Sequence, residues 1–554
     1  MYSIKTMTLE QKIGQLFICG FHSLTPDAHI TALIEEYHIG GVVYFRRNVE
    51  SAAQLAKLSK DLQQMAGRAG APPLLIAIDQ EGGMVSRLDH EGISRIPGNM
   101  SLGAADDPAL TEAVAELSAC ELKLLGMNMN FAPCVDVNNN PLNPVIGVRS
   151  YSEDPVKVAE HGEAAVRGFR RHGIIATAKH FPGHGDTSVD SHLGLASVPH
   201  GSDRLHKVEL LPFKRLIEAG AEAIMTAHVV FPAFEPNGNP ATLSRKVLKE
   251  LLRDELKFEG IIVTDCLEMK AISEQFGVAE GAVMALEAGA DLVLVSHTLS
   301  EQEAAVRAAI EAVRSGRLPE ADIDRSLERI LAIKSGFGQM SAGNPAEEEL
   351  TEPGRPLLPP ERTVSLLEQA ARKSITLVKN EGAQPPLPLD PSEPVLVVWP
   401  ELRHRTEVDE AAEYRYTLGD ALKPYYSNIS QMKVGTHPAG TEVQEVLEQA
   451  SGYKQAVAVT YTSEGKVPEG QVELVKGLMQ LMRQGQLSLT VVSSRNPYDL
   501  LAFPEVDAYL CAYENRPYTL DALAKVLAGK EQPGGKLPVS ISRDYPIGTG
   551  QSSL

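Results

Sequence analysis

Cysteine, tryptophan and basic side chains are scarce in this sequence of 554 residues. Its five cysteines are far apart and show no CxxC spacing, which excludes a small disulfide-stapled fold and favours a reducing, cytoplasmic setting. The 52 Lys and Arg face 72 Asp and Glu, a net charge of −20. Nucleic acid and anionic membrane surfaces select basic patches, so we expect neither as a partner.

Long hydrophobic runs are also missing. No segment supplies the roughly 18 consecutive apolar residues that a membrane span needs. The first residues lead directly into an amphipathic pattern containing Glu10 and Gln11, without the apolar core of a secretory signal. We therefore expect a cytoplasmic protein, or a secreted one whose leader has been removed. At about 100–200 residues per domain, the length predicts two or three domains.

Eight short apolar runs alternate with amphipathic segments up to about residue 335. The runs cover residues 15–20, 41–45, 74–79, 127–132, 174–180, 223–228, 261–265 and 292–296. They are continuous rather than alternating, as in parallel strands that are buried on both faces. Eight strands interleaved with helices predict an α/β fold, a (β/α)8 barrel of the TIM type over residues 1–335. A doubly wound open sheet is the alternative.

A change of composition follows the predicted barrel. Residues 336–362 are mostly rich in Gly, Pro, Ser and Glu and are predicted to be an interdomain linker. New strand-like runs then occur at 374–379, 394–399, 455–461, 487–493 and 508–512, separated by helical patterns. They predict a C-terminal α/β/α sandwich domain over residues 363–554.

Ionisable residues end five of the predicted barrel strands. These residues are Asp79, Lys179 with His180, His228, Asp265 and, just beyond its strand, His297. A single polar residue could mark only the point where a strand reaches solvent. Five positions on the carboxyl-terminal rim, where barrel active sites lie, predict a catalytic site.

The segment 178–192 is the densest cluster of such residues. Asp190 and His192 are two positions apart, so in an extended segment they project to the same side, where a carboxylate raises imidazole basicity for acid/base catalysis. For His184, in a Gly-rich turn, we expect a structural hydrogen bond. The three histidines could instead ligate zinc. However, no H-x-H or H-E-x-x-H spacing is present and Lys179 would repel the ion, so we expect no metal.

Asp265 ends the most β-branched run of the chain. A carboxylate that emerges from a buried strand is rigid and partly desolvated. It suits either a nucleophile or an acceptor for sugar hydroxyls.

Several motifs resemble glycoside hydrolase family 3, and within it the β-N-acetylglucosaminidase branch. In the predicted barrel they are DQEGG (79–83) with Arg87 downstream, NPVIGVRSY (143–151), KHFPGHGDTSVDSH (179–192), MTAHV (225–229), PATLS (240–244) and IVTDCLEM (262–269). In the second domain they are SITLVKN (374–380), SSRNPYDLL (493–501) and GGKLPVSI (534–541). The resemblance covers nearly the whole chain.

The resemblance implies a retaining enzyme without a cofactor, and a role for each matching residue. Asp265 would be the nucleophile, and His192, paired with Asp190, the acid/base. The N-acetylglucosamine ring would be held by Asp79, Arg87, Arg149, Lys179 and His180. The chain departs from the family at Met84, where arginine is frequent, and at Cys266, and neither position carries a proposed chemical role.

The implied partner is a small oligosaccharide. Terminal N-acetylglucosamine would be removed from muropeptides, as in peptidoglycan recycling, or from chitooligosaccharides. A phosphorylase on the same fold is the near alternative, because a neutral histidine does not repel a phosphate dianion as a carboxylate would. The more distant alternatives are a metal-dependent barrel hydrolase and a non-catalytic sugar-binding protein.

Overall fold

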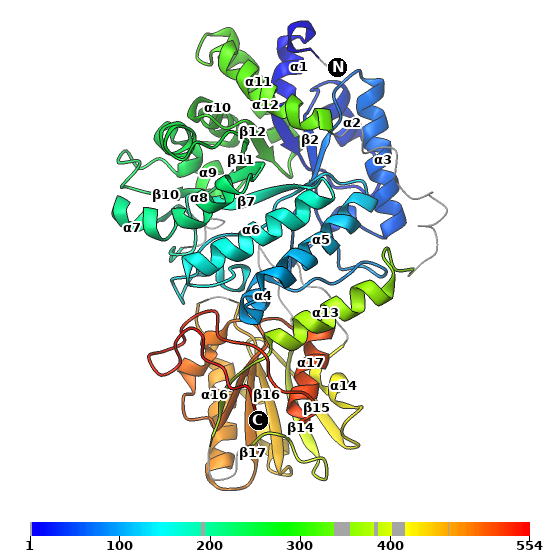
Figure 1. The fold of residues 1–554 in the computed structure, drawn as a ribbon, viewed down its shortest axis with the longest axis vertical. Helices are drawn as coiled ribbons and strands as arrows, with labels where there is room; N and C mark the ends of the chain where they lie inside the picture. Colours follow the sequence, from blue (N-terminus) through cyan, green and yellow to red (C-terminus); the bar gives the residue numbers. More distant parts are fainter. Residues whose placement is uncertain (1–2, 190–193, 337–354, 382–385, 402–415, 464) are drawn as a thin grey trace.

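Eight parallel strands close into a barrel in the N-terminal part of the computed structural model, which describes residues 3–189, 194–336, 355–381, 386–401, 416–463 and 465–554 (Figure 1). The strands are β1 (Phe17–Cys19), β2 (Gly41–Tyr44), β3 (Leu75–Ile78), β6 (Met129–Asn130), β7 (Ile175–Phe181), β9 (Ala223–Thr226), β11 (Ile261–Cys266) and β12 (Leu292–Val295). Each coincides with one predicted run. Because β1 pairs with both β12 and β2, the barrel is confirmed and the open sheet is wrong.

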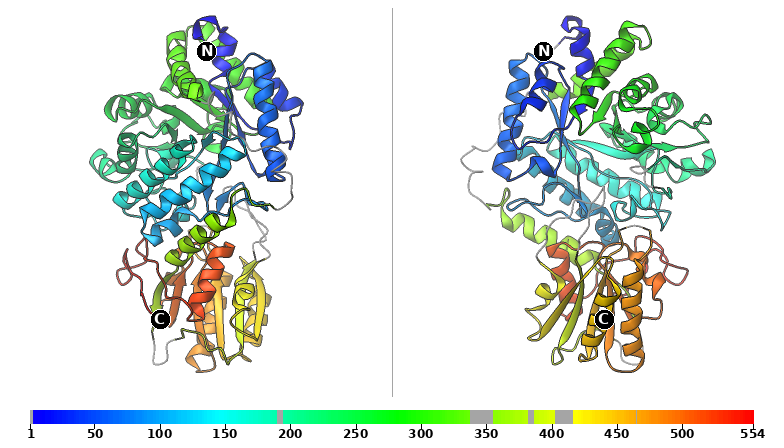
Figure 2. Two further views of the ribbon diagram at one scale, coloured as in Figure 1. Left: turned by 45° about the vertical axis from the view of Figure 1, so that its right-hand side comes forward. Right: turned by 180° about the vertical axis from the view of Figure 1, so that it is seen from behind.

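Helices surround the barrel on its outside (Figures 1 and 2). They are α1 (Leu9–Gly14), α2 (Ala28–Glu35), α3 (Ala52–Arg68), α4 (Asn99–Ala105), α5 (Pro108–Leu124), α6 (Pro155–Arg171), α7 (Ser202–Lys207), α8 (Leu210–Glu218), η5 (Lys246–Glu255), α9 (Lys270–Ser273), α10 (Val278–Ala288), α11 (Leu299–Arg314) and α12 (Glu320–Ser335). Capping residues fix where several of them begin. Asp107 and Asp154 each cap a helix whose first residue is proline, a position that needs no backbone N–H.

Two small sheets lie in the loops that follow barrel strands. A hairpin of β4 (Gln80–Gly82) and β5 (Val85–Ser86) comes directly after β3. A second pair joins β8 (Ala196–Ser197) to β10 (Val229–Val230). Both therefore shape the rim at the carboxyl ends of the strands.

The C-terminal domain is built on one six-stranded mixed sheet in the order β13-β18-β17-β16-β14-β15. The strands are β13 (Thr376–Asn380), β14 (Val395–Glu401), β15 (Ile429–Gly435), β16 (Gln455–Thr460), β17 (Ser488–Ser493) and β18 (Ala508–Cys511), and the helices are α14 (Leu418–Leu422), α15 (Gly440–Ala450), α16 (Glu469–Arg483) and α17 (Pro517–Leu527). Alternate residues of β14 enter two different cores. Leu396 and Val398 pack with α15 and α16, whereas Val397 and Trp399 pack with α14 and α17. Helices on both faces of the sheet give the predicted sandwich.

Helix α13 (Pro360–Ser374) lies between the two domains (Figure 1). Leu367 and Ala370 are part of the barrel's core, while Ala371 and Ile375 belong to the core of the second domain. The helix therefore shares its buried face between both domains.

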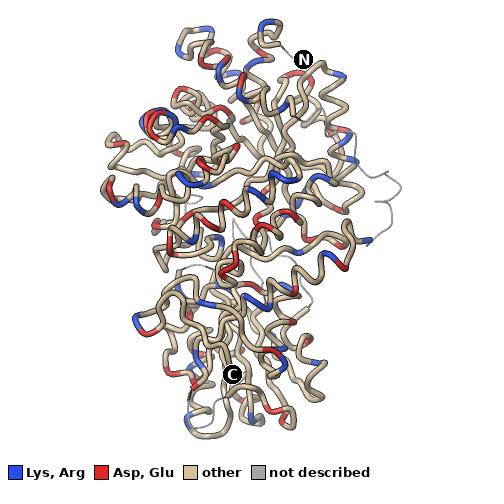
Figure 3. Tube along the Cα trace, viewed as in Figure 1, with Lys and Arg blue, Asp and Glu red and all other residues tan. Residues whose placement is uncertain are grey.

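Basic and acidic residues are interspersed along the helices of both domains (Figure 3). Among the described residues, the helices are all too short or too polar to cross a bilayer.

Candidate active site

Four buried or half-buried charges form an ion-pair network where β3 and β7 end. We call Asp79, Glu81, Arg149 and Lys179 the rim network. Lys179 Nζ lies 2.7 Å from Asp79 Oδ1 and 2.7 Å from Glu81 Oε1. Arg149 donates two parallel bonds to Glu81, Nε to Oε2 at 3.0 Å and Nη2 to Oε1 at 2.8 Å. The residues of β3 are fully buried, so Asp79 is the first of that strand to reach the rim.

Mutual attraction keeps the rim network charged despite its burial. Burial alone would raise the pKa of the Glu81 carboxyl, but Arg149 and Lys179 outweigh it and hold that pKa well below its usual range. Burial would lower the pKa of the Lys179 ammonium, yet Asp79 and Glu81 raise it. Arg87 Nη2 lies 3.9 Å from Asp79 Oδ2, which extends the network toward the opening.

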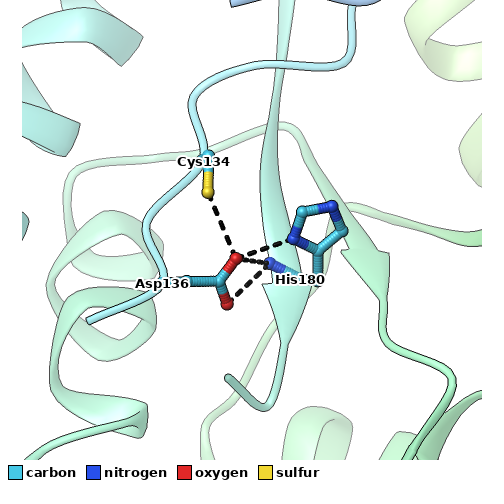
Figure 4. A group of neighbouring side chains, drawn as sticks. All are labelled: Cys134, Asp136 and His180. Atoms are coloured by element: carbon cyan, nitrogen blue, oxygen red, sulfur yellow. Dashed lines mark hydrogen bonds and ion pairs between the residues drawn. The ribbon is translucent and has the colours of Figure 1, made fainter. Parts of the chain in front are cut away.

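Asp136 anchors His180 through both the imidazole ring and the backbone N–H of that residue (Figure 4). His180 Nδ1 is 2.7 Å from Asp136 Oδ2, and the N–H of His184 donates to Oδ1 at 2.6 Å. Burial would raise the pKa of Asp136, but the two histidines lower it to about 2. An ionised carboxylate only accepts, so Nδ1 of His180 carries the proton and Nε2, 3.3 Å from Arg149 Nη2, is the acceptor.

The glycine-rich loop after β7 is tied down by hydrogen bonds. His184 is buried, its Nδ1 is 2.9 Å from Thr187 Oγ1, and burial lowers its pKa to about 4. The structural role predicted for His184 is thus confirmed. Asn143 Nδ2 donates to the carbonyls of His184 and Gly185, both at 2.9 Å. Asp190 and His192, the predicted acid/base pair, lie outside the described residues.

Asp265 ends β11 at the same rim. Ile261 to Thr264 are fully buried, so the half-buried Asp265 is the first side chain of the strand to emerge. Its Oδ1 accepts the N–H of Cys266 at 2.7 Å, which fixes the orientation of the carboxylate. Only β9 separates β11 from β7 in the barrel, so Asp265 and Lys179 lie at one opening.

Two further rim residues support the segment after Asp265. The His228 ring is buried between Thr242 Oγ1, at 2.8 Å from Nδ1, and the Cys266 carbonyl, at 2.9 Å from Nε2. Glu268 accepts N–H bonds from Ser296, His297 and Thr298 at 2.7, 2.6 and 3.0 Å. We interpret both side chains as supports for these loops.

Two groups among the described residues place potential metal ligands close together. They are Cys134 with Asp136 and His180, and Cys266 with Glu268 and His297. Asp136 already accepts from the Cys134 thiol and from two histidines, and Glu268 accepts three backbone N–H groups. A cation would have to displace these donors, so hydrogen bonding accounts for both groups.

Sequence reasoning did not single out Glu81, Asp136 or Asn143. Glu81 lies in the DQEGG motif, Asn143 begins the NPVIGVRSY motif, and Asp136 lies four residues beyond a predicted strand, so the sequence carries a weak signal for each of them. Their partners are distant along the chain. Asp136 meets His180 across 44 residues, and Glu81 meets Arg149 across 68.

Two family models match the chain. The glycosyl hydrolase family 3 N terminal domain matches residues 8–333, and the glycosyl hydrolase family 3 C-terminal domain matches residues 375–549.

Similar proteins extend over almost the full length. The structure of a glycoside hydrolase family 3 beta-N-acetylglucosaminidase from Paenibacillus sp. str. FPU-7 is 47% identical, with a TM-score of 0.92 over 97% of this chain and 99% of that one. Beta-hexosaminidase A of Pseudoalteromonas piscicida is 33% identical and the match covers 95% of this chain and 93% of that protein. A beta-hexosaminidase of Nitrosomonas eutropha is 38% identical over 46% of this chain and 73% of its own length. The chain therefore belongs to glycoside hydrolase family 3.

Proposed function

We propose that this protein is a retaining exo-β-N-acetylglucosaminidase in which Asp265 is the nucleophile. The observation that carries the proposal is the position of Asp265, held at the end of a buried strand on the rim that also bears the Lys179 and Arg149 charges. The full-length similarity to a family 3 β-N-acetylglucosaminidase supports the choice of sugar.

The sugar would be held by Asp79, Arg87, Arg149, Lys179 and His180. The side chains of Asp79 and Arg87 are 19% and 10% exposed, so hydroxyl groups of a bound ring can reach them. Glu81, with 2% of its side chain exposed, would not contact the sugar but would fix the positions of the Arg149 and Lys179 side chains. Hydrogen bonds to charged groups are stronger than neutral ones, and rigid partners orient the ring for attack.

The reaction would proceed in two displacements. An oxygen of Asp265 attacks the anomeric carbon while the bond to the aglycone oxygen breaks, and His192 gives its proton to that oxygen. His192 then removes a proton from water, whose oxygen displaces Asp265 and releases the sugar with retained configuration. Asp190 would orient His192 and raise its basicity.

The natural substrate would be a muropeptide or a chitooligosaccharide. The five free thiols support a reducing compartment, and a cytoplasmic enzyme of this kind would serve peptidoglycan recycling. The catalytic unit would be residues 1–335, followed by a linker over 336–362 and the second domain over 363–554.

Product analysis tests the proposal. The protein would be incubated with an N-acetylglucosaminyl muropeptide and with chitobiose, each with and without phosphate, and the products identified by mass spectrometry. We expect free N-acetylglucosamine in every case. Formation of N-acetylglucosamine 1-phosphate would establish the phosphorylase instead, and no turnover of either substrate or of a nitrophenyl N-acetylglucosaminide would refute the proposal.

A further inference from the structure

A loop of the second domain reaches the barrel at the hairpin that follows β3. Arg516, with 3% of its side chain exposed, donates from Nε to the Gly83 carbonyl at 2.8 Å and from Nη1 to Asp89 Oδ1 at 2.6 Å. Its Nη2 also bonds to the Gly83 carbonyl. The guanidinium of Arg516 thereby connects Gly83, at the tip of the hairpin, to Asp89.

Glu514 holds the other end of the same loop. Its Oε2 accepts the N–H of Gly98 at 2.8 Å, and its Oε1 accepts the hydroxyl of Thr519 at 2.7 Å. Gly83 has a φ of +55°, and a Cβ placed there would lie 2.6 Å from the Cα of Gly98, so the two ends of the loop touch. We call Glu514 and Arg516 the clamp, because they hold the loop 83–98 at both ends.

The clamped loop carries Arg87. The side chain of Gln80 accepts the N–H of Arg87 at 2.9 Å and donates to Ser86 Oγ at 2.9 Å. Ser86 in turn donates to Asp89 Oδ1 at 3.2 Å, the oxygen that Arg516 binds. A continuous series of hydrogen bonds therefore runs from the second domain to the backbone of Arg87.

We propose that the clamp positions Arg87 for sugar binding, an inference that rests on the function proposed above. Glu514 and Arg516 are then positioning residues for the reaction in the barrel. Without Arg516, the buried carboxylate of Asp89 and the Gly83 carbonyl would both lose their hydrogen bonds to a charged guanidinium. The loop would then move so that water could hydrate these two groups. A displacement of about 1 Å at a substrate-binding group is enough to weaken catalysis strongly.

A double-mutant cycle separates positioning from simple fastening of the domains. Arg516→Met should lower kcat/KM roughly 10- to 100-fold, the range for loss of a hydrogen bond to a charged group, mainly through a higher KM. If Arg516 acts through Arg87, the same change in an Arg87→Ala background should lower kcat/KM by less than about 2-fold. Equal losses in both backgrounds would overturn the proposal.

Glu153→Gln is the matched control. Glu153 is a barrel residue whose carboxylate accepts the N–H and the hydroxyl of Ser540 in the second domain, at 2.8 and 2.5 Å. The substitution weakens an interdomain contact away from the loop 83–98, so KM should stay at the wild-type value. A rise in KM equal to that of Arg516→Met would show that any loosening of the interface has the same effect, and would contradict the clamp.

Two measurements keep the outcome decisive. Arg516→Lys retains the charge toward Asp89 without the fork on Gly83, and it should give an intermediate KM that is again insensitive in the Arg87→Ala background. Amide hydrogen exchange of residues 83–88 should be faster in Arg516→Met and unchanged in Glu153→Gln. Exchange does not depend on turnover. An inactive wild type would therefore refute the proposed function, whereas unchanged exchange would refute the clamp.

Discussion

Replacing Glu81 by glutamine removes a charge that is paired with both Arg149 and Lys179. Glutamine keeps the shape and one acceptor oxygen, but it removes the carboxylate that is paired with Arg149, whose side chain is 8% exposed. Breaking a buried ion pair by removing one partner lowers the free energy of unfolding by about 3–5 kcal/mol. We expect the lower end, about 3 kcal/mol, because Lys179 retains Asp79 at 2.7 Å.

The loss of stability in Glu81→Gln should become smaller at acidic pH. The pKa of Glu81 is lower in the folded protein than its ordinary value of 4.5, so its contribution to stability is fully present above that pH. It is lost as the pH falls toward the folded pKa. Glutamine does not titrate. The difference between the free energies of unfolding of wild type and Glu81→Gln should therefore be constant near neutral pH and shrink below pH 4.5.

Glu112→Gln is the control for this prediction. Glu112 also meets two arginines, Arg167 and Arg171, but these are 48% and 56% exposed. Exposed pairs contribute about 0–1 kcal/mol, so the control should change stability little. Urea unfolding of all three proteins, followed by circular dichroism from pH 3 to 8, measures the effect. Equal stability of the two variants at pH 7 would refute the reasoning.

Three further predictions concern the reaction. With a nitrophenyl substrate, whose leaving group needs no proton, His192→Ala should show a fast burst of product followed by slow turnover. With a sugar aglycone, the rate of the same variant should fall roughly 10²–10⁴-fold, and Asp190→Asn should show a smaller loss of the same kind. Equal damage to both substrates in stopped-flow assays would exclude His192 as the acid/base. Asp136→Asn, which removes the ionised acceptor of His180, should lower kcat/KM roughly 10-fold or more in steady-state assays, and an unchanged value would show that this acceptor is dispensable. Excess EDTA should leave activity unchanged, whereas inactivation that zinc reverses would establish a metal-dependent hydrolase.

The barrel strands could be predicted because parallel strands buried on both faces leave continuous apolar runs. β15 could not be predicted, because among the described strands it pairs with β14 alone, at the edge of the sheet, and most of its residues are half-buried. Its sequence, ISQMKVG, mixes polar and apolar residues and resembles a loop.

Some residues of the candidate site could be predicted from the strand pattern, whereas others could not. Asp265 and Lys179 end apolar runs, so their place on the rim follows from the strands themselves. Glu81 and Arg516 have partners fixed only by the tertiary structure. Gly83 and Arg516 are 433 residues apart, and no local pattern connects a loop of the second domain to the barrel's hairpin.

Covalent trapping tests the central claim most directly. A fluorinated N-acetylglucosaminide that forms a slowly hydrolysed glycosyl-enzyme would be added to the wild-type protein and to Asp265→Asn, and the peptic peptides sequenced by mass spectrometry. We predict one added sugar on Asp265 in the wild type, and in Asp265→Asn neither a label nor turnover, with the fold intact by circular dichroism. A label on Asp79, Glu81 or Glu268, or an Asp265→Asn variant that still turns over, would contradict the account.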